Sequence, residues 1–154
     1  MPSADDVIRS LEIRPFQSAD QAAAKALILD GLAGHWGTLD PTLNPDLDDI
    51  AASYAGGAFF TAWIGGTLAG TGAYLPEGPG VYRIVRMSVR AGCRRSGIGS
   101  AILRFLIEKI KAQKAQAIVL ETTTSWHEVI QFYTRHGFSP IGEENGDTTF
   151  QMSL

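Results

Sequence analysis

The chain has 154 residues, of which 45% are hydrophobic and 19% are charged, and this composition predicts one compact domain over residues 1–154 rather than a disordered chain. Its net charge of −3 argues against a general nucleic-acid binder, which needs a broad basic surface. The single cysteine, Cys93, excludes an intrachain disulfide and fits a reducing cytoplasm. No window approaches the ~20 apolar residues of a membrane span, so we expect a soluble, cytoplasmic protein that binds neither nucleic acid nor membrane.

The hydrophobic pattern predicts strands and helices in a defined order. The predicted strands cover residues 11–16, 58–64, 67–75, 81–90, 117–120, 138–141 and 148–152. The predicted helices cover residues 18–32, 97–113 and 126–135, with a further short helix that begins at residue 46. The strands are recognised by alternation and by flanking turns such as Gly65-Gly66, and the helices by apolar residues at helical spacing. This order predicts an α/β fold, a mixed sheet with helices packed on it.

The most informative segment is Arg-Arg-Ser-Gly-Ile-Gly at residues 94–99, between a predicted strand and a predicted helix. The first turn of a helix leaves backbone N–H groups unpaired and carries the positive end of the helix dipole. Glycines let an anion approach the backbone, and Arg94 and Arg95 add full charges, so the segment predicts a phosphate-binding loop. It has neither the P-loop spacing nor the three-glycine dinucleotide fingerprint. The alternative is a solvent-exposed basic turn.

Two motifs make the chain resemble the GNAT superfamily of acetyl-CoA-dependent N-acetyltransferases. The family's loop pattern, Arg/Gln-x-x-Gly-x-Gly/Ala, is matched by Arg94, Gly97 and Gly99. The second motif is Phe-Tyr-x-x-x-Gly-Phe at residues 132–138, and the order of elements is also similar. The resemblance implies a mixed central sheet of about seven strands flanked by about four helices. It also implies an acyltransferase that uses acetyl-CoA as a co-substrate and needs no metal.

The resemblance further implies how the cofactor is held. The strand at residues 86–89 would splay from the parallel strand at 117–120, so that its backbone can pair with the pantetheine amides. The pyrophosphate would bind the loop backbone and its two arginines. The implied cofactor-binding residues are Met87, Ser88, Val89, Arg94, Arg95, Ser96, Gly97, Ile98, Gly99, Ser100, Trp126 and Tyr133. Trp126 and Val129 stand where family members often carry Asn and Ala, so Trp126 can instead shape the pocket.

Tyr133 is implied to be the acid that protonates the thiolate of coenzyme A as it leaves. The alternative is a tyrosine on an amphipathic helix with its hydroxyl at the surface. The attacking amine also needs a base, for which the candidates are Glu121, His127, Glu128 and Glu77. Glu121 is preferred because it ends a strand that faces the predicted cleft, although a solvated strand-end carboxylate is an equal alternative.

Cys93 lies beside two arginines that would favour its thiolate form, which raises the alternative of a covalent acyl-cysteine intermediate. The sequence shows no His and acid on an adjacent strand to activate it, so we interpret Cys93 as a small thiol without a catalytic role.

These patterns predict an N-acetyltransferase that moves acetyl to a primary amine, of a small molecule rather than of a protein, by direct transfer in a ternary complex. Two alternatives stay open: a protein N-terminal or lysine acetyltransferase, and a non-catalytic acyl-CoA-binding sensor. Tyr133 argues against the sensor, which would need the phosphate loop but not the acid. The last strand pair leaves a sheet edge to cover, and on that basis we expect a homodimer.

Overall fold

The computed structural model describes residues 3–37, 43–94 and 96–154. Its centre is a seven-stranded sheet in the order β1-β2-β3-β4-β5-β7-β6. The strands are β1 (Leu11–Pro15), β2 (Ala58–Ile64), β3 (Thr67–Gly78), β4 (Val81–Val89), β5 (Ala117–Thr123), β6 (Ser139–Glu144) and β7 (Asp147–Ser153). Neighbouring strands are antiparallel except β4 and β5, which are parallel. The sheet is therefore mixed, as the sequence predicts.

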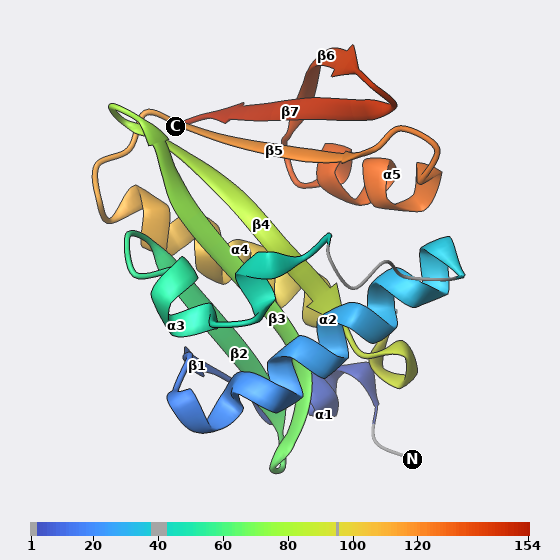
Figure 1. Ribbon diagram of the computed structural model, residues 1–154. Coiled ribbons are helices and arrows are strands. Elements are labelled where there is room, and N and C mark those ends of the chain that lie inside the picture. Colours follow the sequence, from blue (N-terminus) through green and yellow to red (C-terminus); the bar gives the residue numbers. More distant parts are fainter. Residues whose placement is uncertain (1–2, 38–42, 95) are drawn as a thin grey trace.

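Helices cover both faces of the sheet (Figure 1). The helices are α1 (Ala4–Arg9), α2 (Gln21–Trp36), α3 (Ile50–Ser53), α4 (Ile98–Lys111) and α5 (His127–Arg135), with single 3-10 turns at Ser18–Asp20, Pro45–Leu47 and Ala91–Cys93. Helices α4 and α5 pack on one face, and α2 and α3 pack on the other, each with its own buried hydrophobic cluster. None of the helices within the described ranges is both long enough and apolar enough to cross a membrane.

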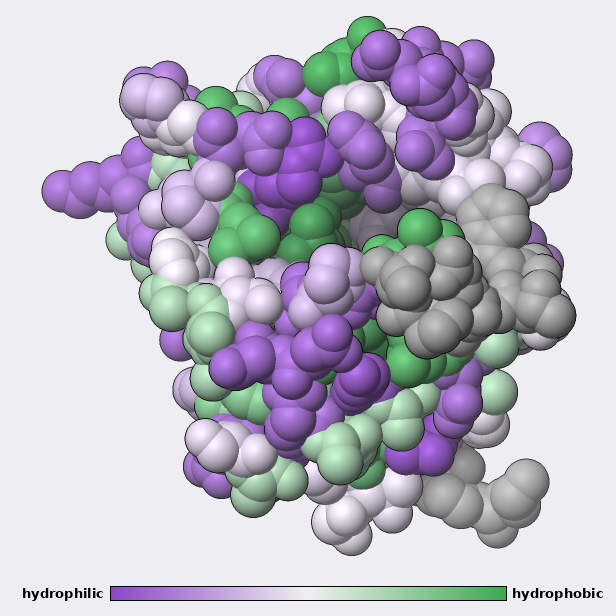
Figure 2. Space-filling view, in the orientation of Figure 1, coloured by the Kyte–Doolittle hydropathy of each residue, from purple (hydrophilic) through white to green (hydrophobic). Residues whose placement is uncertain are grey.

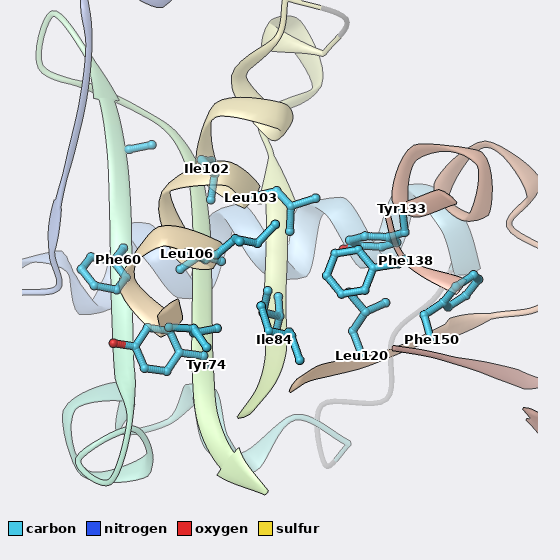
Figure 3. Close-up of a cluster of buried hydrophobic side chains, with 14 of the residues drawn as sticks. Phe60, Tyr74, Ile84, Ile102, Leu103, Leu106, Leu120, Tyr133, Phe138 and Phe150 are labelled. Atoms are coloured by element: carbon cyan, nitrogen blue, oxygen red, sulfur yellow. The ribbon is translucent and has the colours of Figure 1, made fainter. Parts of the chain in front are cut away.

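The larger cluster joins α4, the middle of the sheet and α5 (Figure 3). Helix α4 approaches β3 closely because β3 carries glycine at the contact. A Cβ atom on Gly72 would lie 2.7 Å from Ile102 Cγ2 and 2.9 Å from Leu106 Cδ1, and one on Gly70 would lie 2.7 Å from Ile102 Cδ1. This close packing fixes the first turn of α4 beside the end of β4.

Strand β4 is distorted and then separates from its parallel neighbour. Arg86 and Met87 of β4 stand opposite the single residue Gly72 of β3, which is a β-bulge. Arg86 has a φ of +55°, a left-handed conformation that is unfavourable for a residue other than glycine. Beyond the pairs at residues 81–83, β4 and β5 diverge, while β5 continues to Thr123 (Figure 1). The predicted splay between these strands is confirmed.

All seven predicted strands are present, but several boundaries differ from the prediction. Helix α1 was missed, although a capping box between Ser3 and Asp6 starts it, and the structure thus has five α-helices in its described part rather than about four. Helix α2 continues past the predicted end at Leu32. The short helix expected from residue 46 is instead a 3-10 turn followed by α3. Strand β3 extends through part of the predicted turn to Gly78, because it keeps pairing with β4.

Candidate active site

Two adjoining cavities open where β4 and β5 separate. The first, here called the α4 cavity, has a volume of about 610 Å³ and lies between the end of β4, the first turn of α4 and α5. The second, the α2 cavity, has a volume of about 390 Å³ and lies between α2, β4 and β5. The residues that line both are Met87, Ser88, Val89, Arg94, Glu128, Val129 and Tyr133. Figure 2 shows hydrophobic residues in a depression between the part that holds β5 and the part that holds α2, with hydrophilic residues around it.

One wall of the α4 cavity is the first turn of helix α4, and this wall is suited to binding an anion. Gly97 is the N-cap of this 14-residue helix, has a φ of +86° and provides no side-chain cap. The first backbone bond of the helix runs from Ala101 N to Gly97 O at 3.0 Å, so the N–H groups of residues 98–100 have no partner within the helix. Gly97, Gly99 and Ser100 line the cavity. The backbone and the helix dipole therefore fit a phosphate group.

The other predicted loop residues contribute in different ways. Arg94 is exposed and lines both cavities, where its charge can bind an anion. The Ser96 hydroxyl donates a hydrogen bond to the Cys93 carbonyl oxygen and so braces the loop. The side chain of Ile98 is fully buried in the core, so only its backbone is available. Arg95 lies outside the described residues.

Tyr133 lies between the two cavities and lines both. It is 7% exposed, so it is not the surface tyrosine of the alternative interpretation. Its ring packs edge-on against Phe132, with centroids 5.2 Å apart. It also packs edge-on against Phe138, with centroids 5.9 Å apart (Figure 3). Burial raises the pKa of Tyr133 above its ordinary value, so the phenol keeps its proton at neutral pH. A buried, protonated hydroxyl at this junction can donate a proton to a leaving group.

Glu121 lines the α2 cavity, and its side chain is 47% exposed. Its carboxylate lies 3.1 Å from Arg83 Nη1. Arg83 also donates two hydrogen bonds to the carboxylate of Glu77, from Nε to Oε2 at 2.8 Å and from Nη2 to Oε1 at 2.9 Å. Of the other base candidates, Glu128 lines both cavities, whereas Glu77 and His127 are not among the lining residues of either.

The structure brings most of the predicted cofactor residues to the α4 cavity, but Trp126 lines the α2 cavity instead. That position agrees with a role of Trp126 in shaping the α2 cavity. Cys93 is half-buried and lines the α4 cavity, and its lack of a catalytic role stays a prediction.

Sequence reasoning missed the contribution of α2, whose residues Ile28, Gly31 and Leu32 line the α2 cavity. Gly31 lies so close to β4 that a Cβ atom there would be 3.1 Å from Ser88 Oγ. A glycine within a predicted helix was the available signal, because it often marks close packing.

Comparisons with known proteins agree with this geometry. The sequence profile of the acetyltransferase (GNAT) family matches residues 20–138. The rat N-acetyltransferase 8F1 is 32% identical over an alignment of 126 residues that covers 76% of this chain and 57% of the rat protein. This chain therefore spans little more than half the length of that relative.

Solved structures share the fold at lower identity. An acetyltransferase of the GNAT family from Staphylococcus aureus has a TM-score of 0.86 and 22% identity, over 94% of this chain and 99% of its own. The PaiA N-acetyltransferase of Thermoplasma acidophilum, in complex with coenzyme A, has a TM-score of 0.83 and 16% identity over the same shares.

Proposed function

The chain belongs to the acetyltransferase (GNAT) family, and we propose that it moves the acetyl group of acetyl-CoA to a primary amine of a small molecule by direct transfer in a ternary complex. The observation that carries the proposal is the junction of the two cavities. The buried, protonated Tyr133 lies there, beside a bulged strand that separates from its neighbour.

The α4 cavity is the proposed cofactor side. The unpaired first-turn N–H groups of α4 and the Arg94 guanidinium would hold the pyrophosphate. Beyond residue 83, the edge of β4 that faces β5 is no longer paired with that strand, so it can pair with the pantetheine amides as an added strand would. A structure with the same fold, the PaiA N-acetyltransferase of Thermoplasma acidophilum, was solved in complex with coenzyme A, which supports coenzyme A as the kind of cofactor that this fold holds.

The α2 cavity is the proposed acceptor side. Its volume of about 390 Å³ falls within the usual range for small-molecule sites. Its walls combine apolar side chains such as Ile28 and Leu120 with the carboxylates of Glu121 and Glu128. Carboxylates attract an ammonium group and can accept its proton. A pocket of this size between helix and sheet supports a small acceptor over a peptide, which would need an open groove.

The proposed residues divide the chemistry as follows. Acetyl-CoA supplies an activated acyl group, whose C–S bond breaks as a C–N bond to the acceptor forms. Glu121, directly or through a water, takes the proton that the attacking amine loses. Tyr133 donates its proton to the leaving sulfur and regains one from solvent. Holding both substrates in adjoining cavities supplies proximity, which we propose as a main source of rate.

The test is thiol release from acetyl-CoA in the presence of simple amines, polyamines, amino acids and short peptides. We expect release with small amines and initial-rate patterns that intersect. Release only with peptides would favour a protein acetyltransferase. Tight acetyl-CoA binding without release, for every acceptor class, would favour the sensor.

A further inference from the structure

Arg86, the bulge residue with φ of +55°, is held at both its backbone and its side chain. The Thr71 hydroxyl donates a hydrogen bond of 2.8 Å to the Arg86 carbonyl oxygen. The guanidinium makes a two-pronged ion pair with Asp46, with Nε 2.9 Å from Oδ2 and Nη2 2.6 Å from Oδ1. Paired bonds of this kind fix direction as well as distance. The side chains of Arg86 and Asp46 are only 20% and 29% exposed, so water screens the pair less than it screens a surface pair.

Asp46 is prepared for this contact by its own surroundings. The Tyr54 hydroxyl donates a hydrogen bond of 2.6 Å to Asp46 Oδ2, and Tyr54 is itself buried. Burial alone would raise the pKa of Asp46, but the hydrogen bonds from Arg86 and Tyr54 outweigh it and the pKa is lowered. Asp46 is therefore ionised at neutral pH, and the ion pair is intact there.

The 3-10 turn that carries Asp46 is attached to α2. Gln21 of α2 donates from Nε2 to the Leu47 carbonyl oxygen at 2.6 Å, and its Oε1 accepts the Ile50 N–H at 3.0 Å. Lys25 and Asp48 also form an ion pair at 2.6 Å, but their side chains are 38% and 65% exposed, so this pair contributes little to the attachment. Since α2 forms one wall of the α2 cavity, the Arg86–Asp46 pair links that wall to the bulge of β4.

We propose that the Arg86–Asp46 ion pair is a positioning device that sets the bulge of β4 against α2 and thereby aligns the thioester with the acceptor amine. The inference rests on the proposed function. Met87, the residue after Arg86, lines both cavities, so a shift of the bulge moves the wall on which both substrates would lie. A misplacement of about 1 Å can slow a reaction by about 10²-fold. Arg86 itself also lines the α2 cavity, but its guanidinium is bonded to Asp46, so we assign it a positioning role through the backbone that it holds rather than a catalytic one.

The test compares Asp46→Asn and Arg86→Gly with the matched control Asp48→Asn. Asp46→Asn weakens the pair with almost no change in shape, whereas Arg86→Gly removes it at a residue type that takes φ of +55° without strain. Asp48→Asn makes the same charge change two positions along the chain, at the ion pair with Lys25 on α2 rather than at the bulge. All three variants are first checked for folding by circular dichroism.

Two readouts separate positioning from stability. The first is kcat below the unfolding temperature, with the acceptor that the amine panel identifies. The second needs no acceptor: it is the infrared carbonyl band of bound acetyl-CoA labelled with carbon-13 at the thioester carbonyl. We expect Asp46→Asn and Arg86→Gly to lower kcat about tenfold or more and to move the band away from its position in the wild-type complex, with acetyl-CoA affinity within about twofold of wild type. Because both variants break the same ion pair, we expect the double variant to lose no more kcat than the worse of the two single variants. Asp48→Asn should match the wild type in both readouts.

Wild-type kcat and a band at its wild-type position in folded Asp46→Asn and Arg86→Gly proteins, with only a lower Tm, would overturn the positioning role and leave the proposed function standing. If the wild-type protein failed to bind acetyl-CoA in calorimetry, both the proposed function and this inference would fall.

Discussion

Replacing Tyr133 by phenylalanine removes one hydroxyl and leaves the buried ring in place. The ring contacts with Phe132 and Phe138, at centroid distances of 5.2 Å and 5.9 Å, do not involve the oxygen. We therefore expect Tyr133→Phe to fold normally, with a free energy of unfolding within about 1 kcal/mol of wild type. Any large loss of activity would then be a loss of chemistry.

The expected size of that loss follows from the state of the phenol. Because burial raises the pKa of Tyr133, the hydroxyl is protonated throughout the neutral range and available as an acid. One positioned acid contributes about 10²–10⁴-fold, and a thiolate needs less protonation than poorer leaving groups. We expect turnover to fall roughly 10- to 1000-fold, or roughly 1.4–4 kcal/mol in activation free energy, with acetyl-CoA affinity nearly unchanged.

The assay is the initial rate of thiol release from acetyl-CoA and from an acetyl thioester whose thiol is more acidic. The fall should shrink with the second substrate, since its thiolate leaves with less help. Tyr82→Phe is the matched control, because the Tyr82 hydroxyl donates to Gln113 Oε1 at 2.7 Å and Tyr82 lines neither cavity. Wild-type turnover in Tyr133→Phe would remove this residue from the mechanism, and an equal fall for both thioesters would indicate positioning of the thioester instead of proton donation.

Four further outcomes are expected. Gly97→Asp, which places a carboxylate at a φ of +86°, and Arg94→Ala should each weaken acetyl-CoA binding in calorimetry by about tenfold or more; affinity within twofold of wild type would contradict the phosphate site. Cys93→Ala should keep most activity, and an acetylated Cys93 peptide trapped from acetyl-CoA alone would reverse that expectation. Gly72→Ala should lower the free energy of unfolding by about 1–3 kcal/mol, because its Cβ would lie 2.7 Å from Ile102 Cγ2; an unchanged thermal transition would refute this packing argument. We expect a homodimer, which light scattering at high protein concentration checks directly: a monomeric mass would refute it.

Features that depend on neighbouring residues were predicted well from the sequence. Strand β2 has the predicted bounds, Ala58–Ile64, because the turn at Gly65-Gly66 ends it unambiguously. Both glycines have positive φ, at +54° and +85°, as a hairpin turn of this type requires. The errors have local causes too: α2 continues past the predicted end at Leu32 and through Gly34, because a single glycine is tolerated within a helix that is well packed elsewhere.

The same distinction between neighbouring and distant residues applies to the candidate site. The phosphate loop could be predicted because its chemistry lies within a few consecutive residues. The Arg86–Asp46 pair could not, since it joins residues 40 positions apart and depends on a bulge that only the pairing of β3 with β4 creates. The splay of β4 from β5 was expected through the family resemblance, and no pattern within either strand indicates where their pairing stops.

Gly72 contributes to both the packing of α4 and the bulge of β4. Gly72 stands opposite the bulge on β4, and a Cβ atom there would meet Ile102 Cγ2 and Leu106 Cδ1 of α4 as well as Met87 Sδ of the bulge, at 2.7, 2.9 and 3.1 Å. Its lack of a side chain therefore lets α4 and the bulged part of β4 approach β3 at the same place. Helix α4, held in this way, keeps its anion-binding end beside the α4 cavity. The bulged part of β4 forms the wall that the two cavities share. The distance between the phosphate loop and the proposed reaction centre is thus set by packing in the core of the sheet, which explains why the site motifs alone do not specify it.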